Sequence, residues 1–328
     1  MNSFRFLLLT LLVLIGSLTY AKSTQLEART IKNDIVQINY EFMDKASSQK
    51  EPEITKWVTQ SFKIYQNIFG GLPVDKTGTA YNEYTMRVKH SHHLGGEADP
   101  QIVILNWSDK TLFGYANWKT LLLHELFHLW SAETIRYADP AEHWFNEGFA
   151  EYYAYRTAAQ IGLISPEQAL SIAAHPIGYY VSSKGVGEIS MREAGKENRT
   201  KFDNYFLVYH GGWVVAMTLD HDIRSKTKGE KSLDDLMKWL YIHFQRHERL
   251  YTFKDILFGM KEATGIDYND FFSDYIEGTT AIPVSDYFDL GKTGWDIEFN
   301  HSPYIKHKYL LQTLGVEKAI QVPLVLSD

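Results

Sequence analysis

The feature that most constrains this chain is the segment LLLHELFHLW, which runs from Leu121 to Trp130. Two histidines, His124 and His128, lie four positions apart in an otherwise apolar run, and Glu125 follows the first of them. On a helix, residues four apart share one face, so both imidazoles can reach a single ion. Neutral imidazole is a good ligand for zinc. The segment therefore predicts a buried helix with a metal site, in preference to an ordinary core helix with two satisfied histidines.

A second helical segment, HWFNEGFAEYY, supplies candidates for the remaining protein ligand. A catalytic zinc ion has three protein ligands and an open fourth position. This second helix can present Glu147 to the metal, and Glu151 lies one turn further on the same face. A carboxylate there can accept a hydrogen bond from the free nitrogen of a ligand histidine, unless it is an ordinary solvated carboxylate. Glu125 is then the candidate general base for a water molecule activated by the metal.

Hydrophobic periodicity and turn signals divide the chain into strands followed mostly by helices. Residues 176–203, rich in glycine, serine and charge, are interpreted as a long loop over the site. Strands first and helices second predict an α+β fold with two lobes. The strand-like segments are 31–43, 84–90 and 102–107, and the helical segments are 52–69, 117–132, 143–162, 204–223, 232–247, 252–263 and 267–277, with a further helix start at 165–168.

The N-terminus has the pattern of a secretory signal peptide. Arg5 precedes an apolar run that is too short to span a bilayer comfortably, and Thr19, Tyr20 and Ala21 form a plausible cleavage site. An uncleaved membrane anchor is the alternative. Export implies an oxidising compartment, yet the chain has no cysteine, so no disulfide can form. We expect an exported protein of a bacterial periplasm or the extracellular space, without a transmembrane segment after cleavage.

Charge and composition exclude other classes of protein. The 33 basic and 40 acidic residues give a net charge of −7, which argues against nucleic acid as a partner. Aromatic residues make up 14% of the chain, which suits a folded core and a lined cleft better than disorder.

The histidine pair, the 18 intervening residues 129–146 and then NEGFAEYY form a pattern that resembles the zinc aminopeptidases typified by aminopeptidase N. The chain is more similar still to the glycyl aminopeptidase family, whose members usually join a thermolysin-like catalytic domain to a PDZ domain. The resemblance covers about residues 60–290 and implies a thermolysin-like α+β fold with zinc between two lobes. It rests on IFGGLP at 68–73, on HLW after the histidine pair, on WFNEGFAEYY, and on LDHDIRSKTKGEKSLDDLM at 219–237.

This resemblance implies peptide substrates and a specific set of metal ligands. His124, His128 and Glu147 correspond to residues that bind one zinc ion per chain, and Glu125 to the base and proton shuttle. The chain is thus identified as a zinc metallopeptidase of the gluzincin type, more similar to an aminopeptidase than to an endopeptidase.

A tyrosine in the stretch YHGG completes the resemblance. Tyr209 corresponds to the family tyrosine that donates a hydrogen bond to the tetrahedral oxyanion, a reasonable role for a phenol. The lysine that usually precedes the glycine is replaced by Gly211 here. A packing role for Tyr209, or assistance to the oxyanion by the neighbouring His210, remains an alternative.

Exopeptidases of this clan bind the free amine of the substrate with a glutamate in a glycine-led motif, GxMEN or GGLEH. This chain has Gly95 and Gly96 followed directly by Glu97, so a carboxylate is present but its spacing is shifted. We expect these three residues to bind substrate, with Glu97 at the amine, unless Glu97 is an ordinary turn carboxylate. If Glu97 does not reach the cleft, the expected activity is that of an endopeptidase.

Two further alternatives stay open. The chain could be a non-hydrolytic binding or scaffold protein that keeps zinc for structure, although Glu125 beside an open three-ligand set speaks against it. The histidine cluster HSHH at 90–93 is interpreted as surface or cleft lining, with a second zinc site as the alternative.

We divide the chain into a signal peptide at 1–21, an N-terminal strand or extension at 22–51, a catalytic domain at 52–290 and a C-terminal extension at 291–328. The extensions are too short for the N-terminal β domain and the PDZ domain of the family. A minimal catalytic unit is therefore expected.

Overall fold

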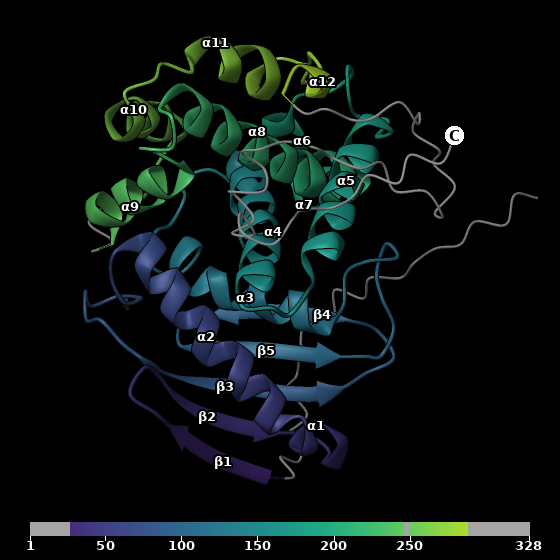
Figure 1. Cartoon of the computed structure of the whole chain (residues 1–328), viewed down its shortest axis with the longest axis vertical. Coiled ribbons are helices and arrows are strands. Elements are labelled where there is room, and N and C mark those ends of the chain that lie inside the picture. Colours follow the sequence, from purple (N-terminus) through teal and green to yellow (C-terminus); the bar gives the residue numbers. More distant parts are fainter. Residues whose placement is uncertain (1–26, 246–248, 288–328) are drawn as a thin grey trace, which may run out of the picture.

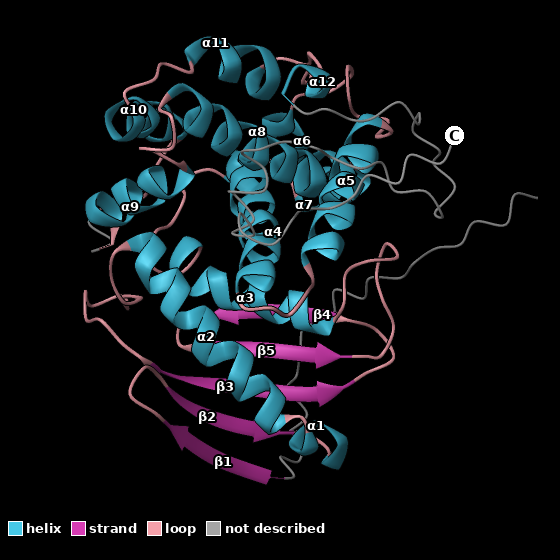
Figure 2. Ribbon diagram, in the orientation of Figure 1, coloured by secondary structure: helices cyan, strands magenta, loops and turns pink. Residues whose placement is uncertain are grey.

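The computed structural model of the protein describes residues 27–245 and 249–287 (Figure 1). A mixed five-stranded sheet lies at one end and helices make up the other, so the fold is α+β with two lobes, as predicted (Figure 2). The strands are β1 (Glu27–Lys32), β2 (Gln37–Phe42), β3 (Glu83–His90), β4 (Gly95–Asp99) and β5 (Ile102–Trp107). Their order is β1-β2-β3-β5-β4, with parallel pairing of β2 with β3 and of β3 with β5. The two edge strands pair antiparallel with their neighbours.

The segment predicted as one strand at 31–43 is two strands joined by a turn, so that prediction is wrong in detail. Asn33 causes the break, because its side-chain oxygen accepts hydrogen bonds from the backbone nitrogens of Ile35 (2.9 Å) and Val36 (3.0 Å). Edge strand β4 contains two glycines among five residues, so strand propensity does not predict it. This strand matters below, because it borders the metal centre.

One face of the sheet is buried by α2 (Glu51–Phe69) and α3 (Trp118–Ser131), which lie side by side. Pro52 lies in the first turn of α2, and Gly70 ends the helix in the left-handed conformation with φ of 80°, as the sequence predicts. The ring of Phe62 on α2 lies 6.3 Å from that of Tyr84 on β3. The apolar positions of α2 that recur at helical spacing are all buried: Ile54, Trp57, Val58, Phe62, Tyr65, Ile68 and Phe69.

The helical lobe is built around α4 (His143–Gln160), which is buried along nearly its whole length. The helix α8 (Gly211–Lys226) crosses α4, and the other helices pack around this pair (Figure 1). They are η1 (Pro140–Glu142), α5 (Pro166–Val181), α6 (Met191–Gly195), α7 (Asn198–Asp203), α9 (Leu233–Phe244), α10 (Phe253–Thr264), α11 (Asn269–Phe272), η3 (Ser273–Glu277) and α12 (Val284–Tyr287), with α1 (Lys45–Gln49) beside the sheet.

The loop predicted at 176–203 is largely helical, so that prediction is wrong. Helix α5 continues through Pro176 to Val181, and α6 and α7 follow. Ser190 starts α6, because its side chain accepts a hydrogen bond from the backbone nitrogen of Glu193 (3.1 Å). Short capped helices of this kind have too few turns to produce a hydrophobic period.

The helix predicted at 204–223 contains a π-helical segment, η2 (Phe206–His210), and then continues as α8. Short π segments inside helices are rare and frequently occur at functional sites. Immediately after η2, Gly212 of α8 meets Gly148 of α4. A Cβ atom at either glycine would overlap the backbone of the other helix, so only glycine permits this close crossing. The crossing packs η2 against α4.

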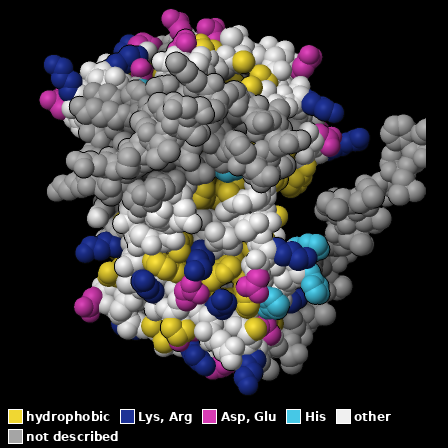
Figure 3. Space-filling view, turned by 45° about the vertical axis from the view of Figure 1, so that its right-hand side comes forward, with side chains coloured by type: hydrophobic (Ala, Val, Ile, Leu, Met, Phe, Trp, Pro, Cys, Tyr) yellow, Lys and Arg dark blue, Asp and Glu magenta, His cyan; other side chains and the backbone are white. Residues whose placement is uncertain are grey.

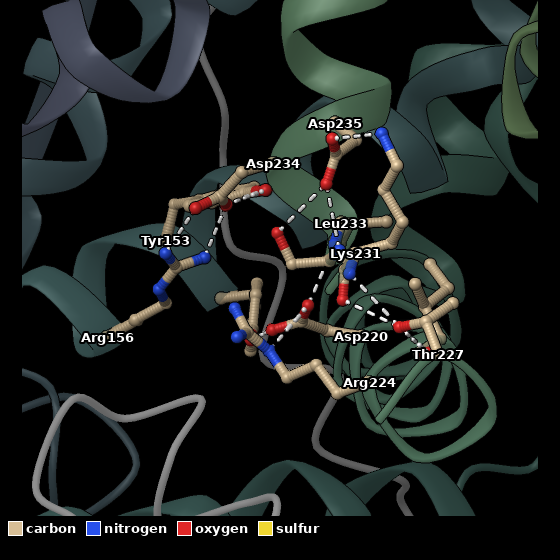
Figure 4. Close-up of polar contacts among 12 residues, drawn as sticks. Tyr153, Arg156, Asp220, Arg224, Thr227, Lys231, Leu233, Asp234 and Asp235 are labelled. Carbon is tan, nitrogen blue, oxygen red and sulfur yellow. Dashed lines mark hydrogen bonds and ion pairs between the residues drawn. The ribbon is translucent and has the colours of Figure 1, made fainter. Parts of the chain in front are cut away.

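A buried polar network ties α9 to the crossing helices (Figure 4). The carboxylate of Asp220 accepts hydrogen bonds from the Tyr152 hydroxyl (2.5 Å), from Arg224 (3.1 Å) and from the first backbone nitrogen of α9 (2.8 Å). Beside it, Asp234 on α9 binds both terminal guanidinium nitrogens of Arg156 on α4. Removing one partner from such a set leaves an uncompensated buried charge, so we interpret the network as structural.

No helix in the two described ranges is long and apolar enough to cross a membrane. The predicted signal peptide at 1–21 and the C-terminal extension at 291–328 lie outside the described residues, and both stay predictions. The predicted N-terminal extension is described from residue 27 onward, where its strands join the same sheet as β3.

Candidate metal centre

Helix α3 begins at a strong N-cap. The side-chain oxygen of Asn117 accepts a hydrogen bond from the backbone nitrogen of Thr120 (3.4 Å), and the hydroxyl of Thr120 accepts one from that of Asn117 (3.1 Å). This reciprocal capping box fixes where the helix starts. From Leu122 to Ser131 every side chain of the helix is buried. The polar groups in that stretch therefore need partners inside the protein.

The three predicted ligands meet between α3 and α4. The Nε2 atoms of His124 and His128 are 3.0 Å apart, and Oε2 of Glu147 lies 3.4 Å from the first and 3.5 Å from the second. One donor atom from each residue lies within 4.8 Å of the others. The two histidines are buried, and Glu147 is partly exposed.

This donor set fits a zinc ion. Ligand atoms 2.0–2.1 Å from a tetrahedral ion lie roughly 3.3 Å from one another, and the three separations above scatter around that value. Two imidazole nitrogens and one carboxylate oxygen are also the donors of one class of catalytic zinc site, which leaves a fourth position open. The residues present are therefore suited to hold one zinc ion.

The two histidines differ in what their second ring nitrogens contact. Nδ1 of His128 lies 3.1 Å from the hydroxyl of Ser131, close enough for a hydrogen bond that orients the ring. Nδ1 of His124 lies 3.7 Å from Oε1 of Glu151, which is beyond hydrogen-bond distance, and it has no hydrogen-bond partner within the described ranges. Glu151 thus faces His124 as an electrostatic partner. Ser131 was not predicted, although its position three residues after His128 is a helical neighbour spacing.

Carboxylates around the centre shift the pKa values of its groups. Burial lowers the pKa of His124, but Glu147, Glu151 and Glu125 more than offset this effect and raise the pKa to about 9. Burial raises the pKa of Glu147, yet hydrogen bonds with His124 and His128 bring it well below its usual value. In the metal-free protein the centre therefore holds a proton that a metal ion must displace.

Glu125 lies beside the edge strand β4. A Cβ atom at Gly96 would overlap the Glu125 side chain, so glycine lets the strand pass close to the carboxylate. Burial raises the pKa of Glu125, and the opposing effect of His124 and His128 is too small to cancel it. A carboxylate with a raised pKa at the edge of a sheet is well suited to exchange protons with a bound molecule.

The structure does not bring Glu97 to the metal ligands. Successive side chains of a strand point to opposite faces, and Gly96 faces Glu125, so Glu97 points to the other face of the sheet. The register agrees, because Glu97 pairs with the half-buried Ile104, whereas Ala98 pairs with the buried Val103. The glutamate of GxMEN or GGLEH is the fourth residue of the motif. Counting from Gly95, Ala98 occupies that position here, and the shifted spacing places Glu97 on the outside, where it is exposed.

Tyr209 lies in η2, on the helical side of the centre, and is half-buried. Its ring stacks on that of Tyr205, with 4.2 Å between the centroids. Burial and then Glu147 raise the pKa of Tyr209, so its hydroxyl stays protonated and able to donate. Burial, Glu151 and Glu147 likewise raise the pKa of Tyr205. The carboxylates of the centre thus raise the pKa values of both phenols. Tyr205 was not predicted, although its spacing of four residues from Tyr209 is a helical neighbour spacing.

A third tyrosine approaches from the loop between α3 and α4. The Tyr137 hydroxyl lies 3.2 Å from Nε2 of His143, whose Nδ1 lies 2.9 Å from the carbonyl oxygen of Gly195. Since the carbonyl can only accept, Nδ1 donates to it and Nε2 accepts from Tyr137. Burial and then Glu147 raise the pKa of Tyr137. His143 was not predicted, although it lies four residues before Glu147 on the same helix face.

The histidine cluster at 90–93 does not form a metal site in the described structure. His90, His92 and His93 are exposed, and histidine side chains gather on the surface in Figure 3. Within the described ranges, the group arranged to hold a metal ion is that of His124, His128 and Glu147.

Residues 117–214 match the model of the M61 glycyl aminopeptidase family. The matched segment begins at the N-cap of α3, contains the three clustered donors and ends just after the glycine crossing of α4 and α8. No sequence among the curated proteins matches the chain.

Solved structures with a similar fold include an aminopeptidase N family protein and M1 zinc metallopeptidases. An aminopeptidase N family protein from Idiomarina loihiensis superposes with a TM-score of 0.67 and 16% identity, over 80% of this chain and 48% of the other. An M1 zinc metallopeptidase from Deinococcus radiodurans superposes with a TM-score of 0.58 and 17% identity, over 78% of this chain and 53% of the other. A mutant M1 zinc metallopeptidase from the same organism is bound to a Tyr-Ser-Ala substrate. It superposes with a TM-score of 0.55 and 16% identity, over 78% of this chain and 53% of the other. The chain spans about half the length of these proteins, and at such identities the likeness shows the fold.

Proposed function

We propose that this chain, which has the fold of the M1 zinc metallopeptidases, is a zinc-dependent peptide hydrolase of the aminopeptidase type. The observation that carries the proposal is the cluster of His124, His128 and Glu147 with Glu125 beside it at the open edge of the sheet. A purely structural zinc site normally has four protein ligands. Three donors next to a buried carboxylate therefore favour hydrolysis over a scaffold role.

In the proposed reaction, zinc supplies a Lewis acid that activates water and polarises the scissile carbonyl. Glu125 accepts a proton from the attacking water and passes it to the leaving amine. Tyr209 donates a hydrogen bond to the oxyanion that develops on the carbonyl oxygen. No described strand pairs with the outer edge of β4, so the substrate backbone can align along it as an added strand, next to Gly96.

The oxyanion role predicts the effect of Tyr209→Phe. This change keeps the ring and its stacking on Tyr205, so zinc content should not change. In the wild-type protein, the hydrogen bond from the Tyr209 hydroxyl strengthens as the carbonyl becomes an oxyanion. Its loss is therefore expected to lower kcat roughly 10²–10³-fold, with a smaller change in KM. Steady-state kinetics on a peptide substrate measures both values. A kcat within about threefold of wild type would exclude this role and direct attention to Tyr205 or Tyr137.

An endopeptidase is the second candidate, because Glu97 points away from the metal centre. Amine recognition by Glu97 requires that Glu97→Ala raise KM for a peptide with a free amine more than for its N-acetylated form. From its outward orientation we expect both KM values to change by less than about twofold, as for other surface substitutions. A selective rise for the free peptide would instead return Glu97 to the site.

Digestion of peptides by the wild-type protein separates the two candidate activities directly. Stepwise release of single N-terminal residues identifies an aminopeptidase, and internal cleavage of N-acetylated peptides identifies an endopeptidase.

We further propose that the protein is exported and cleaved after Ala21, on the pattern of its first 21 residues. The mature chain is then expected to begin at Lys22, which N-terminal sequencing of protein from the periplasm or medium measures. Recovery of a chain that begins at Met1 would contradict the proposal.

A further inference from the structure

A direct contact joins the loop before α3 to the π segment η2, which carries Tyr209. The hydroxyl of Tyr115 lies 2.6 Å from Nε2 of His210, and both side chains are buried. Tyr115 lies two residues before Asn117, the N-cap of α3, and His210 is the residue after Tyr209. The hydrogen bond therefore links the start of the helix that holds two metal ligands to the segment that holds the proposed oxyanion donor.

Apart from Tyr115, His210 has no polar anchor within the described ranges. Its Nδ1 is buried and has no hydrogen-bond partner among the residues that the structure describes. Burial lowers the pKa of His210 to about 3, so the ring is neutral at ordinary pH. Aromatic rings pack against it: its ring centroid lies 5.0 Å from that of Tyr179 and 5.3 Å from that of Phe113. The bond to Tyr115 is thus the polar contact that sets the rotation of this ring.

The other end of the contact is held by an unusual loop. Phe113 has a positive φ of 53°, which a residue with a side chain rarely adopts, and Gly114 follows with 75°. Paired backbone hydrogen bonds between Leu112 and Ala116, at 2.8 and 2.9 Å, close this turn. Backbone strain of this kind persists only where the surroundings enforce it. The turn directs Phe113 and Tyr115 together toward His210.

A π segment needs such tertiary support. Its wider turn is rare because the regular helix is more stable, so external contacts must select it. In η2 the ring of His210 packs against those of Phe113, Tyr179 and Phe206, and the ring of Tyr205 stacks on that of Tyr209.

We propose that Tyr115 is a positioning residue, whose hydrogen bond to His210 holds the π segment in the register that directs Tyr209 at the metal centre. The inference rests on the proposed function, since it assigns Tyr115 a role in the same reaction through Tyr209. It predicts that loss of the Tyr115 hydroxyl misplaces the oxyanion donor while the metal ligands on α3 and α4 stay in place.

The contact itself is tested without any activity measurement. Tyr115→Phe, His210→Leu and the double variant form a cycle of chemical denaturation experiments on the metal-free protein. Each single variant leaves one buried polar group without its partner, and the double variant leaves neither. The double variant is therefore expected to lose less stability than the sum of the single variants. Additive losses would show that the bond does not exist in solution and would overturn the proposal.

The effect through Tyr209 is tested by kinetics on the zinc-loaded protein. Tyr115→Phe is expected to lower kcat roughly tenfold, with KM within about twofold, because small misplacements of a catalytic group cost this much or more. In a Tyr209→Phe background the same change is expected to have no further effect on kcat. An equal loss in both backgrounds, or no loss in either, would overturn the proposal. His210→Leu serves as the second variant if Tyr115→Phe does not fold.

Tyr155→Phe is the matched control. Its ring lies 5.7 Å from that of Tyr115, and its hydroxyl donates to Thr120 (3.2 Å), so it removes a buried hydroxyl next to α3 without touching η2. Its kcat is expected to stay within about twofold of wild type. A loss as large as that of Tyr115→Phe would mean that general loosening explains both variants. If wild type hydrolyses no peptide, the proposed function fails and the catalytic role of Tyr115 fails with it, whereas the stability cycle still decides whether the contact exists.

Discussion

Replacing Glu125 with glutamine is expected to leave the metal content unchanged and to reduce kcat about 10²–10⁴-fold. Glutamine has nearly the same shape and fits beside Gly96, so the fold and the three metal donors should be preserved. It cannot accept a proton from water, and the proposed base is lost. Metal analysis and steady-state kinetics on the same preparation measure the two quantities.

The result also separates an enzyme from a scaffold. A zinc protein without hydrolytic activity has no use for a base, so Glu125→Gln would then change no measured property except local stability. A variant that hydrolyses peptides at the wild-type rate would show that the base has been assigned to the wrong residue. Glu151 would be the next candidate, because its carboxylate is near enough to Glu125 to affect the pKa of that residue.

Glu147→Ala is expected to lose the metal and, with it, all zinc-dependent hydrolysis. Two imidazoles remain, and they lack the carboxylate that completes the three-donor set. Loss of an outer partner typically weakens metal affinity 10–100-fold, and loss of a direct ligand should weaken it more. Dialysis against graded chelator concentrations, followed by metal analysis, measures the affinity.

Glu151→Gln is the control for that experiment. Its carboxylate lies one turn along α4 and faces His124 at 3.7 Å, outside the donor set. We expect this variant to bind zinc about 10–100-fold more weakly than wild type, but to regain full loading at high zinc concentration. A Glu147→Ala protein that retains zinc as tightly as Glu151→Gln would remove Glu147 from the ligand set.

Long periodic elements could be predicted from the sequence because their signals are local. The apolar spacing of α2, with Pro52 at its start and Gly70 at its end, is of this kind. Thr252 likewise caps α10, at the start of the helix predicted at 252–263. Helix geometry places His124 and His128 on one face of a helix, and the resemblance to the aminopeptidase pattern implies that Glu147 joins them at one centre.

The remaining features depend on information that a local pattern does not contain. The face on which Glu97 lies is set by the pairing of β4 with β5, and a shift of one residue reverses it. The π segment at Tyr209 depends on the packing around His210, and the short helices after α5 depend on single caps such as Ser190. In each case the deciding contact comes from elsewhere in the chain or from one side chain.

The glycine crossing of α4 and α8 limits how this centre can diversify. Most helix pairs rest on side chains, and substituting a larger or smaller residue changes their spacing by fractions of an ångström. Where Gly148 meets Gly212, main chain rests on main chain, and no smaller residue exists. The separation between α4, which carries Glu147, and the segment with Tyr209 is therefore already at its minimum and can only increase. Variants with altered substrate range should accordingly carry their changes in the turn at Phe113 or along β4, and a directed-evolution library could leave both glycines untouched.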